Sequence, residues 1–260
     1  MSRTIDVNCD LGEGFGPYSL VDDVGMLEHV SSANVACGFH AGDPSRMVEV
    51  VAAAAALGVA VGAHPGYPDR AGFGRRPMPL SAAEVEAALL YQLGAITGLA
   101  RAYGVTVAHV AVHGALEEEA VRDPARAAAV AGAVRRFDPR LVVVTQPGEL
   151  AEAARSMGLA VAIQFHADRG YDESGRLLSR SRPGAVITDP DIVVARVLRL
   201  LADGVVETAG GALLPLDAST ICLHGDGEAA IALAAATRAG LEAAGITLEP
   251  LRRTPLTDGA

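Results

Sequence analysis

Histidines and acidic residues recur in this sequence directly after short apolar runs, a placement that suits acid–base or metal chemistry. Five of the seven histidines follow such runs, namely His40, His64, His113, His166 and His224. Asp10, Glu13, Asp168 and Asp226 occupy positions of the same kind. Imidazoles and carboxylates that meet in one pocket could move protons, stabilise developing charge or bind a divalent ion. Asp10, His40 and His64 are the candidate metal ligands.

Other polar residues at these positions are candidates for substrate binding: Asn8, Asp43, Arg70, Arg169 and His224. An arginine could hold a carboxylate through two parallel hydrogen bonds, although charges on a long loop are often only solvated. Asp43 precedes a proline and equally suits the N-cap of a helix. His29 and His109 are interpreted as packing or surface residues. The cysteines Cys9, Cys37 and Cys222 are interpreted as small buried apolar residues, and no local signature marks Cys37 as a nucleophile.

Short apolar runs alternate with longer helical patterns along the whole chain. Strands are predicted at Ile5–Cys9, Asn34–Cys37, Val59–Ala63, Val105–Val112, Leu141–Thr145, Ala160–Phe165 and Thr220–Leu223, with Ile246–Leu248 as a candidate eighth. Helices are predicted at Asp22–Val30, Pro44–Leu57, Ser81–Tyr103, Pro124–Phe137, Gly148–Met157, Asp189–Asp203 and Glu228–Ala244. Ser81 and Glu84 have the spacing of a capping box, and Gly58, Gly104, Gly158 and Gly245 have the position of helix C-caps.

Seven or eight such units favour one closed (β/α) barrel spanning residues 1–260. In that fold the carboxyl ends of the strands meet at one face, so the candidate residues would converge there. An open, doubly wound sheet is the alternative. The segment Gly204–Pro215 interrupts the pattern and is expected to form a hairpin or an irregular insertion.

Composition excludes several classes of function. The chain has 260 residues and a net charge of −10 without charge blocks, which argues against nucleic acid or an anionic membrane as a partner. All 21 basic residues are arginine, so a Schiff-base lysine and a Walker-A loop are excluded. Three cysteines, no apolar leader and no long apolar run are typical of a cytoplasmic protein.

Several long motifs resemble those of the LamB/YcsF family, the A subunit of prokaryotic ATP-dependent 5-oxoprolinase. They are "VNCDLGEGFG", "SSANVACGFHAGDP", "GVAVGAHPGYPDRAGFGRR", "VHGAL", "FHADRGY" and "TICLHGD", in family order between residue 5 and about residue 245. The resemblance implies a glycoside hydrolase/deacetylase-like barrel, usually with seven strands. It also implies site roles for Asp10, Glu13, His40, His64, Asp168 and Asp226.

The implied activity is hydrolytic opening of the 5-oxoproline lactam to glutamate, with ATP as cosubstrate and with partner subunits B and C. Because no P-loop exists here, ATP is expected to act through the partners. Asp10 or His40 would serve as general base, and His64 and His113 would donate hydrogen bonds to the oxyanion or leaving group. Arg169 or Arg70 would hold the substrate carboxylate. Self-association of the chain stays open.

The chain departs from the family at two strand ends. Family members typically read Lys-Pro-His-Gly-Ala-Leu-Tyr-Asn after the fourth strand, whereas this chain has Ala111, Glu117 and Glu118 at the lysine, tyrosine and asparagine positions. Gln164 and His166 stand where Glu and Phe are more usual. Two other functions therefore stay open: metal-dependent amide hydrolysis without ATP, and a non-catalytic ligand-binding subunit.

Overall fold

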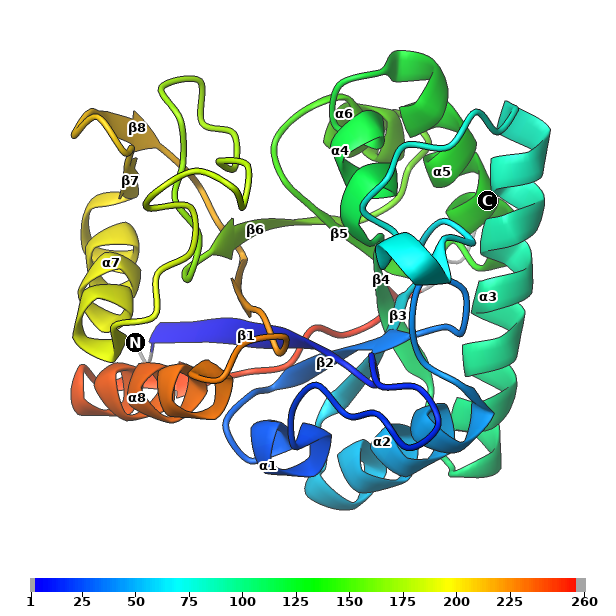
Figure 1. Ribbon diagram of the computed structural model, residues 1–260, viewed down its shortest axis with the longest axis horizontal. Coiled ribbons are helices and arrows are strands. Elements are labelled where there is room, and N and C mark those ends of the chain that lie inside the picture. The colour runs from blue at the N-terminus through cyan, green and yellow to red at the C-terminus, as the bar shows by residue number, and fades with distance from the viewer. Residues whose placement is uncertain (1–2, 256–260) are drawn as a thin grey trace.

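Seven parallel strands form a closed barrel in the computed structural model, which describes residues 3–255 (Figure 1). They are β1 (Arg3–Leu11), β2 (Ser32–Ala36), β3 (Ala60–His64), β4 (Val107–Ala111), β5 (Val142–Thr145), β6 (Val161–His166) and β9 (Thr220–Leu223). β9 pairs with both β6 and β1, and this double pairing closes the barrel. The predicted (β/α) barrel is confirmed, and the open sheet is wrong.

An eighth parallel strand, β10 (Ile246–Leu248), lies outside the closed ring. It pairs with residues 3–5 at the start of β1, whereas β9 pairs with residues 6–9. Beyond β10 the backbone N–H of Leu251 donates to Ser32 Oγ at the start of β2, and Arg253 Nε donates to the carbonyl of Val107 at the start of β4. The C-terminal segment therefore covers the amino ends of the strands.

The helices surround the barrel, as Figure 1 shows. They are α1 (Asp23–Leu27), α2 (Pro44–Leu57), α3 (Ala82–Ala102), α4 (Gly114–Ala120), α5 (Pro124–Phe137), α6 (Glu149–Ser156), α7 (Pro190–Asp203) and α8 (Ala230–Ala243). Ser81 and Glu84 form the predicted capping box at α3. Among residues 3–255, no helix has both the length and the apolar character needed to cross a membrane.

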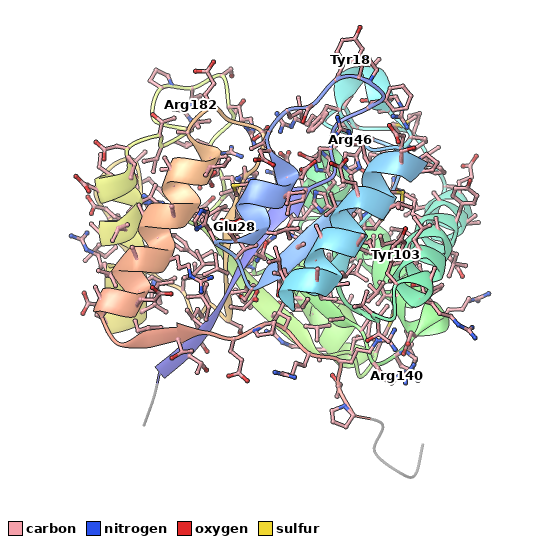
Figure 2. The ribbon with its side chains drawn as sticks, turned by 90° about the horizontal axis from the view of Figure 1, so that it is seen from below. Tyr18, Glu28, Arg46, Tyr103, Arg140 and Arg182 are labelled. Atoms are coloured by element: carbon pink, nitrogen blue, oxygen red, sulfur yellow. The ribbon has the colours of Figure 1, made fainter. Side chains whose placement is uncertain are left out.

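Two connections differ from a plain strand–helix alternation. β7 (Val205–Glu207) and β8 (Leu213–Pro215) form an antiparallel pair, which confirms the hairpin interpretation of this segment. A short 3-10 turn, η1 (Arg70–Gly72), follows β3. Figure 2 shows the barrel from the side, with Tyr18 and Arg182 in loops at one end and Arg140 at the other. The loops that follow the strands therefore gather at a single face.

The main hydrophobic core lies between the strands and the helices, whereas part of the barrel interior is polar. In β1 the apolar Val7, Cys9 and Leu11 belong to the core, while Asp6, Asn8 and Asp10 alternate with them. Successive side chains of a strand point to opposite faces, so the polar set faces inward. This alternation places a column of buried polar groups beneath the functional face.

Hydrogen bonds link these interior groups across the barrel. Asp6 accepts from the hydroxyls of Ser31, Ser32 and Thr220. Higher up, Asn34 Nδ2 lies 2.7 Å from Asn8 Oδ1 and 2.9 Å from Asp10 Oδ1, and His109 Nε2 lies 2.7 Å from Asn34 Oδ1. Because Asn34 is bound to Asn8 and His109 as well as to Asp10, the network fixes the position of the Asp10 carboxylate.

Candidate active site

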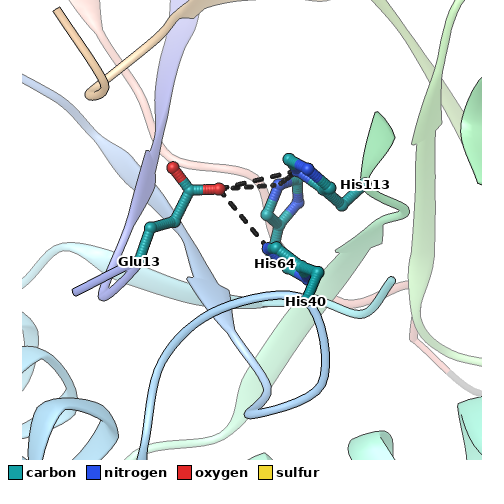
Figure 3. A group of neighbouring side chains, drawn as sticks. All are labelled: Glu13, His40, His64 and His113. Carbon is teal, nitrogen blue, oxygen red and sulfur yellow. Dashed lines mark hydrogen bonds and ion pairs between the residues drawn. The ribbon is translucent and has the colours of Figure 1, made fainter. Parts of the chain in front are cut away.

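Four buried side chains from four strand ends converge at the functional face (Figure 3). Glu13 follows β1, His40 follows β2, His64 ends β3, and His113 lies between β4 and α4. One nitrogen or oxygen atom of each residue lies within 4.8 Å of the corresponding atoms of the other three. We call these residues the histidine–glutamate group.

Backbone carbonyls determine which nitrogens of two imidazoles carry protons. His64 Nδ1 lies 2.7 Å from the carbonyl oxygen of Ala111, and His113 Nε2 lies 2.8 Å from that of Phe73. A carbonyl oxygen only accepts, so both nitrogens are N–H donors. His64 Nε2 and His113 Nδ1 lie 2.9 Å apart, and in the neutral rings both would present lone pairs. Two facing lone pairs repel each other, so this contact suits a shared proton or a bound cation.

His40 and Glu13 are buried without hydrogen bonds to some of their polar atoms. His40 is fully buried and stacks on His113, with ring centroids 3.9 Å apart, yet neither of its nitrogens has a hydrogen-bond partner among the described residues. Glu13 Oε1 likewise has no hydrogen bond among the described residues, although it lies 3.4 Å from His40 Nε2, 3.5 Å from His113 Nδ1 and 3.9 Å from His64 Nε2. Each such group costs about 1–3 kcal/mol if it stays unsatisfied. Of these atoms, His40 Nε2 and Glu13 Oε1 face each other, whereas His40 Nδ1 lies on the side of Gly66.

Burial opposes charge on both residues. It raises the pKa of Glu13 well above its ordinary value, an effect that the neighbouring Asp10 reinforces. It lowers the pKa of His40 well below its ordinary value, together with the nearby His113 and His64. Without a cation, neutral forms are favoured in a site built of metal-binding residue types. Three imidazole nitrogens and one carboxylate oxygen are a donor set that Zn²⁺ commonly takes, so these residues fit a divalent ion.

Asp10 lies next to this group, with its Oδ2 3.5 Å from His64 Nε2. The sequence predicted Asp10, His40 and His64 as the metal ligands. The structure instead groups His40 and His64 with Glu13 and His113, while Asp10 is held by Asn34. Asp10 is thus placed beside the histidines, where it can accept a proton or a hydrogen bond.

A second cluster follows β6 and β9. Asp168 accepts hydrogen bonds from the backbone N–H of His224, at 3.0 Å, and from His224 Nδ1, at 2.8 Å. Although burial opposes the shift, the His224 contacts lower the pKa of Asp168 to about 2, and Asp168 raises that of His224. His166 and Cys222 lie beside this pair, and the ring of His166 stacks on that of His224 at 5.3 Å.

A cavity of about 480 Å³ joins the two clusters. Its lining includes Asp10, His64 and His113 on one side and His166, Cys222 and His224 on the other. Arg75 and Arg180 also line it, and both form ion pairs with Asp226, at 2.5 Å and 3.1 Å. These two guanidinium groups share one carboxylate, so Arg75, Arg180 and Asp226 together keep one net positive charge, which suits an anionic ligand. We call these three residues the cationic rim.

The remaining predicted residues have other positions. Asn8 lies in the interior network below the cavity. Asp43 caps α2 and also accepts from the backbone of Gly16, which matches its capping interpretation. Arg70 donates to the carbonyls of Gly38 and Gly42 and does not line the cavity. Arg169 does line it, but its guanidinium is bound to the carbonyls of Leu178 and Ala185.

Sequence reasoning did not assign a role to several polar residues of the cavity. Glu117 is buried in α4, and Gln164 Nε2 donates to its Oε1 at 2.8 Å. Burial raises the pKa of Glu117 to about 7 despite that hydrogen bond. Gln146 and Arg180 were missed as well. The run "LEEE" has no feature that distinguishes the buried Glu117 from its neighbours.

Comparisons with known proteins identify the family of this chain. The model of the LamB/YcsF family matches residues 5–255. The 5-oxoprolinase A subunit of Chloroflexus aggregans is 51% identical over 253 residues, covering 97% of this chain and 99% of that protein. A 5-oxoprolinase A subunit of Pseudomonas syringae pv. tomato, the one numbered 3, is 48% identical over 249 residues, covering 95% and 97% respectively.

The solved structures include a similar protein. The crystal structure of "Lactam Utilization Protein" from Thermus thermophilus superposes with a TM-score of 0.89 at 45% identity, covering 94% of this chain and 98% of that one. The match therefore extends over nearly the whole of both chains. The chain belongs to the LamB/YcsF family.

Proposed function

We propose that this chain is the A subunit of an ATP-dependent 5-oxoprolinase, which hydrolyses the lactam of 5-oxoproline to L-glutamate together with subunits B and C. The observation that carries the proposal is a cavity lined by imidazoles, carboxylates and a cationic rim in a chain about half identical to proteins named as the A subunit of 5-oxoprolinase. The word "subunit" in those names supports an assembly of several chains.

Lactam hydrolysis sets three tasks that the cavity residues can perform. Water must lose a proton, the developing oxyanion must be stabilised, and the ring nitrogen must gain a proton. Asp10, fixed by Asn34 beside His64, is placed to accept the proton. The N–H groups of His64 and His113 are bound to backbone carbonyls, so these rings keep their orientation while a proton moves at the facing nitrogens.

The cationic rim would bind the carboxylate of the substrate. Arg75 and Arg180 are held near each other by Asp226 and retain one net positive charge between them. This role replaces the one predicted for Arg70 and Arg169, whose guanidinium groups are bound to backbone carbonyls. ATP would act through subunits B and C, since the sequence has no lysine and hence no Walker-A loop.

In an alternative reaction the histidine–glutamate group would hold a divalent ion, and the facing nitrogens of His64 and His113 would then bind the ion instead of moving a proton. Glu13, His40, His64 and His113 would be its ligands, because one donor atom of each lies within 4.8 Å of the donor atoms of the other three. Such an ion lowers the pKa of bound water and polarises a carbonyl. This group favours a second candidate function, metal-dependent amide hydrolysis without ATP.

The test is glutamate release from 5-oxoproline by the complex of this chain with subunits B and C, with and without ATP. We expect turnover only with ATP and all three subunits. Release by the isolated chain without ATP would refute the coupled reaction and favour the metal-dependent hydrolase. Saturable binding of 5-oxoproline without turnover under every condition would indicate a binding subunit.

Matched variants connect the activity to the site. His64→Gln is expected to lower kcat by about 10²–10⁴-fold, the range for loss of a proton-transfer group. The control is His29→Gln, because His29 follows α1 and does not line the cavity. Equal turnover in the two variants would remove His64 from the mechanism.

A further inference from the structure

A second set of metal-binding residue types lies across the cavity from the histidine–glutamate group. His166, Cys222 and His224 each place one donor atom within 4.8 Å of the donor atoms of the other two. His166 ends β6, and Cys222 and His224 flank the end of β9, which pairs with β6. The pairing of these strands brings the three side chains together, with His166 opposite Cys222 in the register.

The unexplained feature of this cluster is His166. It is 4% exposed, and neither of its ring nitrogens has a hydrogen-bond partner among the described residues. A neutral imidazole always carries one N–H donor and one acceptor, and buried groups of both kinds are normally paired. The ring also lines the cavity, so an unpaired nitrogen is available to a bound species.

Asp168 gives the cluster the second feature of a metal centre. It accepts a hydrogen bond from His224 Nδ1, which fixes the ring and leaves Nε2 free of that contact. Metal-binding histidines usually donate their other N–H to a carboxylate in this way, which sets the tautomer and raises the basicity of the ligand. Asp168, which the sequence predicted as an active-site residue, thus orients His224 as a potential metal ligand.

We propose that His166, Cys222 and His224 bind a divalent transition ion of the zinc class, with Asp168 orienting His224. A thiolate with two imidazoles is a donor set that suits borderline-soft ions and disfavours Mg²⁺ or Ca²⁺. On binding, the Cys222 thiol loses its proton to solvent, and the thiolate and Asp168 together balance the two charges of the ion. Three protein ligands leave one position open toward the cavity, as in catalytic rather than structural zinc sites.

Cobalt is the probe, because a thiolate bound to Co²⁺ gives a near-ultraviolet charge-transfer band that imidazole and carboxylate ligands do not. The full chain, freed of metal, is titrated with Co²⁺ and followed by absorption. We expect a saturable band that Zn²⁺ abolishes by displacement. The histidine–glutamate group contains no thiol, so this band reports on the second site alone and is independent of the proposed reaction.

Variants decide the assignment. Cys222→Ser should lose the band, whereas Cys37→Ser should keep it, since Cys37 is buried after β2 and its Sγ donates to the carbonyl of Val35. Asp168→Asn should weaken Co²⁺ binding by about 10–100-fold. His166→Phe should weaken Co²⁺ binding at least as much. If Cys222→Ser does not fold, His166→Phe tests the assignment in its place. Absence of the band in the parent chain, or a band unchanged by His166→Phe, would overturn the proposal.

Discussion

Gly62 in β3 offers a sharp test of the interior network, through the change Gly62→Ala. Gly62 is paired with His109 of β4, and a Cβ atom at position 62 would overlap the imidazole ring of His109. The ring cannot withdraw freely, because His109 Nε2 is bound to Asn34 at 2.7 Å. The methyl group therefore forces the imidazole off the amide that also holds Asp10.

The expected loss of stability has two parts. Overpacking of a buried site costs about 1–3 kcal/mol. Separating His109 from Asn34 leaves a buried carbonyl oxygen unpaired, which costs about 1–3 kcal/mol more. The sum is about 4 kcal/mol, a large share of the 5–15 kcal/mol by which such domains are usually stable. Since Asn34 also positions Asp10, turnover should fall as well.

Urea unfolding followed by circular dichroism measures the free energy of unfolding of each variant. Gly94→Ala in α3 is the matched control, because a Cβ there meets nothing within 4 Å, and it should stabilise the helix by about 0.5–1 kcal/mol. Adding His109→Ala to Gly62→Ala removes the overlapping ring, so the double variant should lose less than the sum of the two single losses. A Gly62→Ala chain as stable as the parent would refute the reasoning.

Three further predictions test the cavity and the helix ends. Burial raises the pKa of Glu117 from its ordinary 4.5 to about 7. The protonated carboxyl therefore contributes to the free energy of unfolding fully below pH 4.5, and this contribution is lost as the pH rises through 7. Glu117→Gln should remove about 3 kcal/mol of that pH dependence, measured by urea unfolding at pH 4 and pH 8, and an unchanged slope would contradict it. Ser81→Ala breaks the capping box of α3 and should cost about 1 kcal/mol, whereas Ser156→Ala near the end of α6 should change thermal stability little. Gly204 ends α7 with φ of 68°, so Gly204→Ala should lower the melting temperature, and an increase would show that the cap tolerates a side chain.

Local signals explain which elements could be predicted. The bounds of α2 and α5 agree with the prediction because an Asp-Pro pair begins each helix. The strand ends could be recognised because histidines and glycines interrupt apolar runs. By contrast, α4 was missed because it has only 7 residues and because His113, at its N-cap, forms no side-chain capping hydrogen bond.

Side-chain partners were harder to predict than elements. His109 was correctly interpreted as a packing residue, yet its bond to Asn34 crosses from β4 to β2 and leaves no mark in the local sequence. Arg70 was predicted to bind a carboxylate, but its guanidinium donates instead to the carbonyls of Gly38 and Gly42 in the loop after β2. Such contacts depend on the register of paired strands and on the path of loops, which residue types alone do not specify.

The pairing of β9 with both β1 and β6 has a consequence for synthesis on the ribosome. β1 is made first, but Asp6 finds its Thr220 partner only 214 residues later. Until β9 emerges, the nascent chain can form at most an open sheet with unpaired edges at β1 and β6, and such edges readily pair with other chains. We therefore expect the unfinished polypeptide to need protection by chaperones, and translational pausing before residue 220 to increase its aggregation.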